Sequence, residues 1–266
     1  MSKYIGLDIG SVSADLVVLD ERQRIHETRY VRTYGRPMQV ALEELQDLQD
    51  NHPGVEGLAV TGSGAERVGE LLEVPFVNEI MAQSRATAFL HPDVRTIIEI
   101  GGEDSKMIQL EEGEDDVRVG DFVMNALCSA GTGSFLDQQA SRLDVSIEEF
   151  SQLALKSENP PRVAGRCSVF AKTDMIHLQQ QGTPDYDIIA GLCFAMARNF
   201  KSNVAVGKEF TPPVAFQGGV AANEGMVRAF KEVLGMDEDE FIIPEYYGCT
   251  GALGAVLHAM ENEMDC

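Results

Sequence analysis

Acidic and hydroxyl side chains stand beside glycines in two stretches of the chain, and this combination is suited to binding phosphate. Residues 8–13 read DIGSVS, and residues 99–105 read EIGGEDS. Glycine lets the backbone approach a ligand closely, so that amide groups can surround phosphate oxygens. Carboxylates near a polyphosphate become favourable when Mg²⁺ lies between them, because this cation takes oxygen ligands. The two stretches predict a site for a nucleotide with Mg²⁺.

A third glycine stretch, QGGVAAN at residues 217–223, follows an apolar run and precedes a helical pattern. This placement suits the close approach of a nucleoside. The chain lacks the Walker pattern GxxxxGK followed by Ser or Thr, and no GxGxxG stands at its first turn. Each glycine stretch taken alone is most often a simple turn. Three of them in this order are a more specific signal.

The elements that must position these stretches read as strands alternating with helices. We expect strands at 4–20 (a hairpin), 24–32, 57–61, 95–110 (a second hairpin) and 214–217, and helices at 37–51, 78–90, 134–142, 147–156, 169–181, 186–206, after 217 and from 248. A strand–polar-turn–strand unit opens each half, with no linker between the halves. The doubling predicts two related α/β domains around a nucleotide cleft, 1–90 and 91–247, with the helix at 248–266 packing back on the first.

Composition excludes several classes of partner. The 266 residues include 21 Lys and Arg against 43 Asp and Glu, a net charge of −22 that repels nucleic acid and anionic lipid. No apolar run approaches the roughly 20 residues of a membrane span, and the start MSKYIGLDIG reads as a strand without a basic region. We therefore expect a cytoplasmic protein. The five histidines show no HxxxH or HExxH spacing, so neither a histidine metal site nor a Ser-His-Asp hydrolase is supported.

The cysteines do not form a disulfide framework, since their number is odd and no CxxC pair occurs. They are Cys128, Cys167, Cys193, Cys249 and Cys266. A lone cysteine is most often a small buried hydrophobe. We expect this packing role for Cys193, within an apolar helix, and for Cys249, beside a glycine-rich helix. Cys266 is the last residue, and we expect no ligand role for it.

The order of these motifs resembles the actin, Hsp70 and sugar-kinase ATPase fold. Within that fold the chain is similar to the BadF/BadG/BcrA/BcrD ATPase family, especially its activators of 2-hydroxyacyl-CoA dehydratases. The resemblance covers essentially the whole chain and is carried by residues 6–13, 99–106, 125–137 (NALCSAGTGSFLD) and 166–171 (RCSVFA), with agreement at 216–226 and 248–255. The two cysteine contexts are its family-specific part.

The resemblance implies an ATPase coupled to electron transfer. It implies a homodimer that shares one 4Fe-4S cluster, with Cys128 and Cys167 of each chain as ligands. ATP hydrolysis would drive a low-potential electron to a partner iron–sulfur dehydratase or reductase, with reduced ferredoxin or flavodoxin as the donor.

The physical context of these two cysteines agrees with the resemblance. Four thiolates are needed, so two cysteines per chain suffice only across a two-fold axis. Each precedes a predicted helix, where free N–H groups and the helix dipole stabilise an anionic cluster. Gly131 and Gly133 would let backbone amides approach its sulfides.

The motifs and the resemblance together assign roles to individual residues. We expect Asp8 and Glu99, with Ser11, to hold Mg²⁺, and Glu103 or Asp104 to position the attacking water. The expected phosphate-binding residues are Gly10, Ser11, Val12, Ser13, Gly101, Gly102 and Ser105, and the expected nucleoside-binding residues are Gly218, Gly219 and Asn223. Glu99 and Glu103 depart from the family, whose dehydratase activators usually have Asp and Gln there.

Three alternatives remain open on sequence alone. A subunit of a benzoyl-CoA-reductase-like complex would pair with a second, related chain. A small-molecule kinase of the same fold would transfer phosphate to an added acceptor, although 266 residues leave little room for an acceptor-binding lobe. A regulatory module would sense nucleotide without redox chemistry, and its partner binding would survive loss of both candidate ligands.

Overall fold

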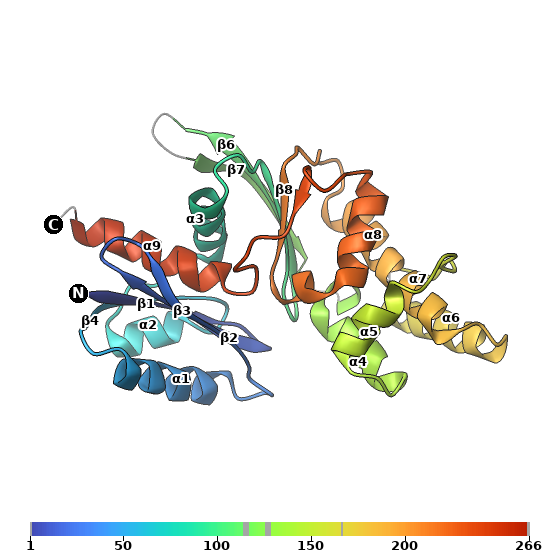
Figure 1. The fold of residues 1–266 in the computed structure, drawn as a ribbon, viewed down its shortest axis with the longest axis horizontal. Helices are drawn as coiled ribbons and strands as arrows, with labels where there is room; N and C mark the ends of the chain where they lie inside the picture. Colours follow the sequence, from blue (N-terminus) through green and yellow to red (C-terminus); the bar gives the residue numbers. More distant parts are fainter. Residues whose placement is uncertain (1, 114–116, 126–128, 166, 265–266) are drawn as a thin grey trace. The chain divides into compact units, whose positions relative to one another are not determined.

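A computed structural model describes residues 2–113, 117–125, 129–165 and 167–264. The described chain divides into two compact units (Figure 1). The first is drawn from Met1–Val94, Leu110–Asp121 and Pro244–Cys266, and the second from Arg95–Gln109 and Phe122–Ile243. No helix among the described residues is long and apolar enough to cross a membrane.

The first unit is built on a sheet with strand order β3-β2-β1-β4. Its strands are β1 (Lys3–Ile9), β2 (Ser13–Asp20), β3 (Ile25–Arg32) and β4 (Val55–Thr61), and its helices are α1 (Pro37–Asn51), α2 (Glu66–Leu72), α3 (Glu79–Leu90) and α9 (Thr250–Met264). β2 runs antiparallel to both β1 and β3, whereas β4 lies parallel to β1. A parallel neighbour needs a crossover connection, and α1 lies in the chain between β3 and β4.

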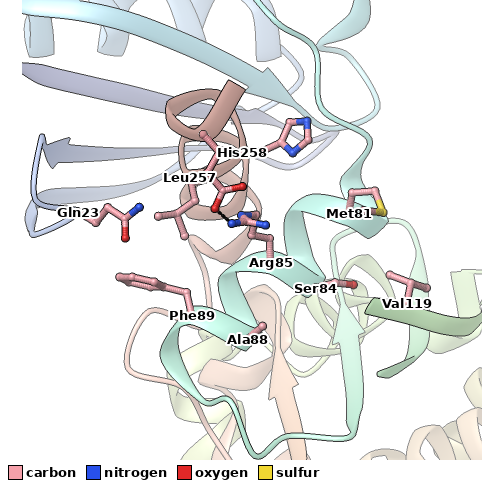
Figure 2. Close-up of a pocket in the computed structure, with 10 residues that line it drawn as sticks. Gln23, Met81, Ser84, Arg85, Ala88, Phe89, Val119, Leu257 and His258 are labelled. Atoms are coloured by element: carbon pink, nitrogen blue, oxygen red, sulfur yellow. Dashed lines mark ion pairs between the residues drawn. The ribbon is translucent and has the colours of Figure 1, made fainter. Parts of the chain in front are cut away.

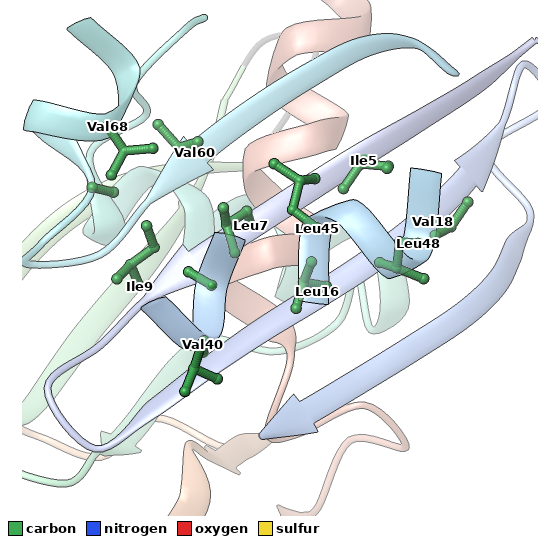
Figure 3. Packing of buried hydrophobic residues seen from close by; sticks show 13 residues of the cluster. Ile5, Leu7, Ile9, Leu16, Val18, Val40, Leu45, Leu48, Val60 and Val68 are labelled. Atoms are coloured by element: carbon green, nitrogen blue, oxygen red, sulfur yellow. The ribbon is translucent and has the colours of Figure 1, made fainter. Parts of the chain in front are cut away.

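Alternate residues of β2 pack on opposite faces of this sheet, as the period of two in a strand requires. Leu16 and Val18 belong to a core that includes residues of α1, drawn in Figure 3. Val17 and Leu19 belong to a second core, with residues of α3 and α9. Both faces of the sheet are therefore covered, which explains why β1 and β2 read as almost continuous apolar runs.

The second sheet has the order β7-β6-β5-β8-β9 and belongs to the second unit except for residues 110–121 of β6 and β7, which are part of the first. Its strands are β5 (Thr96–Ile100), β6 (Ser105–Glu112), β7 (Val117–Asn125), β8 (Val214–Gln217) and β9 (Phe241–Ile242), and the helices of the second unit are α4 (Gly133–Arg142), α5 (Ile147–Ala154), α6 (Ser168–Gln180), α7 (Asp185–Asn199) and α8 (Glu224–Leu234), with helical turns η1 (Ser129–Gly131), η2 (Phe200–Val204, a π-turn) and η3 (Gly219–Ala222). An aromatic core joins Phe216 of β8 to Phe230 of α8, with ring centroids 5.0 Å apart, and Phe230 to Phe200 at 5.6 Å.

The two sheets repeat one arrangement. In each, an antiparallel hairpin (β1–β2 or β5–β6) gains a parallel strand beside its first member, β4 or β8. This repeat agrees with the two strand–turn–strand units expected from sequence. Three elements were not expected: α2, β7 and the two-residue strand β9. α2 is short and contains Gly69, and β7 carries the exposed apolar residues Phe122 and Met124.

Candidate functional site

The first phosphate stretch forms a tight turn between β1 and β2. The Gly10 N–H donates to the Ser13 carbonyl at 3.0 Å. Thr33, directly after β3, braces the same turn: its N–H donates to the Val12 carbonyl at 2.8 Å and its hydroxyl to the Ser11 carbonyl at 3.1 Å. The turn is thus fixed by backbone contacts, while the side chain of Ser11 is exposed.

Glycines of two other elements surround the Asp8 carboxylate. Gly62, just after β4, has φ +99°, and a Cβ atom there would collide with Asp8 Oδ1. Gly251 lies in the first turn of α9, and a Cβ atom there would collide with Asp8 Oδ2. The start of a helix carries the positive end of its dipole, which favours a carboxylate. The sequence therefore places Asp8 where the end of β4 meets the start of α9.

A second carboxylate adds to the negative charge around Asp8. Asp15 is buried and is the cross-strand partner of Asp8 in the β1–β2 ladder. Burial, followed by the charges of Asp15 and Asp8, raises the pKa of the Cys249 thiol to about 12. That thiol donates to the Arg29 carbonyl at 3.4 Å. The packing role expected for Cys249 is confirmed by its burial, and the carboxylate pair favours a cation in this unit.

The second phosphate loop is built around a buried lysine. Lys106 is the cross-strand partner of Glu99, and its Nζ lies 2.7 Å from Glu99 Oε2 and 2.7 Å from Asp104 Oδ2. Only 3% of Lys106 and 5% of Glu99 is exposed. Asp104 is therefore held in an ion pair, whereas Glu103, the other candidate for positioning water, is exposed. Sequence reasoning gave Lys106 no role, although a lysine within the apolar strand SKMIQL was a signal.

Helix α4 is bonded directly to this loop. The N–H groups of Gly133 and Ser134 donate to the carbonyls of Gly101 and Gly102, both at 2.9 Å. The Ser105 hydroxyl is buried and has no hydrogen-bond partner among the described residues. Because α4 follows the segment containing Cys128, the loop and that segment adjoin the same helix. Cys128 itself lies outside the described residues.

The third glycine stretch meets the second loop within the same unit. Gly218 has φ +84°, and a Cβ atom there would lie 2.5 Å from the Ile100 carbonyl oxygen and 2.7 Å from Glu99 Oε1. Gly219 begins η3. Asn223 caps α8, since its Oδ1 accepts from the Met226 N–H at 3.0 Å. Its amide nitrogen is buried and has no partner in the part of the chain that the structure describes.

Cys167 occupies the N-cap position of α6 with extended backbone, and its side chain does not cap the helix. It is partly exposed and carries a free thiol. The donor chemistry therefore fits an iron–sulfur ligand at a helix start. Cys193 is fully buried, which confirms its core role, and burial raises its pKa to about 12. Across the described residues, no three or more His, Cys, Asp or Glu side chains gather as a metal-binding group.

A separate hollow in the first unit, of about 180 Å³, is lined by none of the residues expected to bind nucleotide or metal (Figure 2). Side chains of α3 and α9 form much of its wall. Arg85 of α3 points toward α9 and forms an ion pair with Glu261. Its cation is thus neutralised within the unit.

A repeated sheet with a glycine-lined polar turn at each hairpin is the architecture of the actin-like ATPase fold. A glucokinase of the ROK family from Streptomyces griseus shares this fold, with a TM-score of 0.56 at 15% identity over 98% of this chain and 100% of that one. The match to a solved activator of 2-hydroxyisocaproyl-CoA dehydratase from Clostridium difficile, which has ADPNP bound, is much stronger. The TM-score is 0.85 at 30% identity, over 99% of this chain and 96% of that one.

Comparison of sequences points to the same group of proteins as comparison of structures. The chain is 32% identical over 262 residues to the 2-hydroxyisocaproyl-CoA dehydratase activator of Clostridioides difficile, covering 97% of this chain and 95% of that protein. It is 31% identical over 269 residues to the (R)-2-hydroxyglutaryl-CoA dehydratase activating ATPase of Acidaminococcus fermentans, covering 98% and 99%. Residues 5–259 match the BadF/BadG/BcrA/BcrD ATPase family, and the chain belongs to that family.

Proposed function

We propose that this protein is an ATP-dependent activator that delivers one low-potential electron to a partner iron–sulfur dehydratase or reductase. One observation carries the proposal beyond ATP hydrolysis. The second phosphate loop is hydrogen-bonded to the start of α4, and the segment before that helix contains Cys128. A nucleotide-dependent shift of the loop would therefore reach a candidate cluster ligand through one helix.

The turns at 8–13 and 99–105 would cradle the phosphates, with Mg²⁺ held by Asp8 and Glu99. Lys106 neutralises part of the charge of Glu99 and Asp104, and so lets two acids stand beside a polyphosphate. Gly218 and Gly219 would admit the nucleoside close to the backbone.

The redox end uses Cys128 and Cys167 from each of two copies of the chain. A 4Fe-4S cluster bound there would accept and release the single electron. The partly exposed thiol of Cys167 at the start of α6 supports this assignment. The free N–H groups of that helix start would stabilise the anionic cluster, and a reduced ferredoxin or flavodoxin would supply the electron.

Iron chelation tests the proposed coupling. A nucleotide can shift a conformational equilibrium only if it binds the two states with different affinity. The anaerobic, cluster-loaded protein should lose iron to a chelator at different rates in its nucleotide-free, Mg-ADP and Mg-ADPNP forms. Equal rates in all three forms, with nucleotide binding verified, would leave a plain ATPase and refute the activator.

A further inference from the structure

We propose that Gln83 is a positioning residue for Asp8, and that Thr250 sets the orientation of the Gln83 side-chain amide. The inference rests on the function proposed above, because it takes Asp8 as a ligand of Mg²⁺. All three residues belong to the first unit, on α3, β1 and α9. Neither Gln83 nor Thr250 lies in one of the three glycine stretches expected to bind nucleotide.

A buried hydrogen bond decides which end of the Gln83 amide is left for other neighbours. The hydroxyl of Thr250, the first residue of α9, donates to Gln83 Oε1 at 2.6 Å. Only 6% of Gln83 and 1% of Thr250 is exposed. A side-chain amide has an accepting oxygen and a donating nitrogen, so an oxygen that is held by a hydroxyl fixes where the nitrogen lies.

The donating end of this amide adjoins the Asp8 carboxylate. A Cβ atom at Gly251 would collide with Asp8 Oδ2 and would lie 3.2 Å from Gln83 Nε2. The carboxylate oxygen and the amide nitrogen therefore border the same point at the start of α9. An ionised carboxylate can only accept hydrogen bonds, so an N–H donor on this side favours one orientation of Asp8.

Close backbone packing holds Gln83 in register with α9 and β1. A Cβ atom at Gly254 of α9 would collide with the backbone of Ala82, the neighbour of Gln83 in α3. A Cβ atom at Gly6 of β1 would collide with the Ala252 carbonyl of α9. The three elements thus meet through backbone rather than through flexible side chains. A positioning residue needs such rigid support, because binding groups must be held to within about 0.5 Å.

The chemistry of Mg²⁺ gives the orientation of Asp8 a measurable consequence. This cation demands near-octahedral geometry and gives up its waters reluctantly, so a carboxylate that is already oriented costs less free energy to recruit. Gln83 should therefore strengthen nucleotide binding only when Mg²⁺ accompanies the nucleotide. A purely structural residue would change nucleotide binding equally with and without the metal.

The test compares calorimetric binding of ADPNP by the full-length protein in Mg²⁺ and in EDTA. The parent protein should bind more tightly in Mg²⁺, and Asp8→Asn should remove most of this gain. Gln83→Met, which keeps the length of the side chain without its amide, should weaken binding in Mg²⁺ about tenfold, the effect of one hydrogen bond to a charged group, and leave binding in EDTA unchanged. Gln139→Met, the same change at a buried glutamine of α4, should alter neither affinity.

Thr250 offers a matched pair of variants that does not depend on the folding of Gln83→Met. Thr250→Val removes the hydroxyl and keeps the shape, so it should weaken binding selectively in Mg²⁺. Thr250→Ser retains the hydroxyl and should bind as the parent does. Added to Asp8→Asn, Gln83→Met should have no further effect on the Mg²⁺-dependent gain, because the carboxylate that it positions is gone.

Two kinds of failure are distinguishable. Equal weakening in Mg²⁺ and in EDTA, or a full Mg²⁺-dependent gain in both Gln83→Met and Thr250→Val, would overturn the positioning role and leave Asp8 as a ligand. A gain that survives Asp8→Asn would refute the proposed Mg²⁺ site and the positioning role together. The electron-transfer part of the proposed function is tested separately by iron chelation.

Discussion

Lys106 connects the two acids that flank the second phosphate loop. Its ammonium group lies between Glu99 and Asp104, 2.7 Å from an oxygen of each, in a nearly solvent-free position. Charges buried in this way are tolerated because they are paired, and removing one partner leaves an uncompensated charge. The loop geometry therefore depends on a residue outside the glycine motif that defines it.

Replacing this lysine tests its role. Lys106→Met should lower the free energy of unfolding by about 3–5 kcal/mol, the usual cost of breaking a buried pair. Urea unfolding measures the change. Lys156→Met, at an exposed position of the same unit, should stay within about 0.5 kcal/mol of the parent. Adding Glu99→Gln to Lys106→Met should recover part of the loss, since it removes a stranded carboxylate. A loss no larger than that of Lys156→Met would contradict this account.

At the residue scale, sequence indicated which side chains could act but not how they are bonded. The acids and glycines of residues 8–13 and 99–105 stand out from types and spacing alone. The ion pairs of Lys106 depend on the β5–β6 register, which is set by non-local pairing. Asn223 shows the same limit: the sequence predicts that it meets a nucleoside, but not that its side-chain oxygen caps α8 while its amide nitrogen keeps no partner among the described residues.

At the element scale, the spacing of apolar residues along the sequence predicted most of the helices and strands. The hairpins β1–β2 and β5–β6 and the helices α1 and α3 follow from apolar patterns of period 2 and about 3.6. α2 was not predicted because it spans only seven residues and contains a glycine. β7 follows an acidic run that is typical of a solvated turn. Nothing in the neighbouring sequence indicates what the exposed apolar residues of β7 would pack against.

Gly218 is the position where an element junction depends most clearly on glycine. Its φ of +84° and ψ of 170° lie in a region that is essentially restricted to glycine, and the Ile100 carbonyl leaves no room for a side chain. Gly218→Ala should therefore lower the free energy of unfolding by about 3 kcal/mol or more, from backbone strain and overpacking together.

Gly182 provides a matched control for this change. It has a similar φ of +77°, and a Cβ atom there would meet nothing within 4 Å. Gly182→Ala should cost only about 1–2 kcal/mol, the strain of a left-handed residue. Chemical denaturation of both variants compares them directly. Equal costs would show that the contact of Gly218 with the β5 loop is unimportant.

At the scale of the whole molecule, one sheet arrangement occurs twice, and each copy carries one of the two turns predicted to bind phosphate. The doubling was visible in sequence because each half opens with the same strand–turn–strand pattern. The proposed cluster needs two copies of the chain, because its four thiolate ligands are Cys128 and Cys167 from each copy.

Iron stoichiometry tests this central claim most directly. Anaerobically reconstituted protein should hold about four irons per dimer, since each chain supplies two of four thiolates. Cys128→Ser and Cys167→Ser should each lose the cluster, because symmetry removes two ligands at once, while nucleotide binding persists. Cys193→Ala, which alters a buried core thiol, should keep it. Four irons in a monomer, or full iron retention in Cys128→Ser or Cys167→Ser, would contradict the shared cluster.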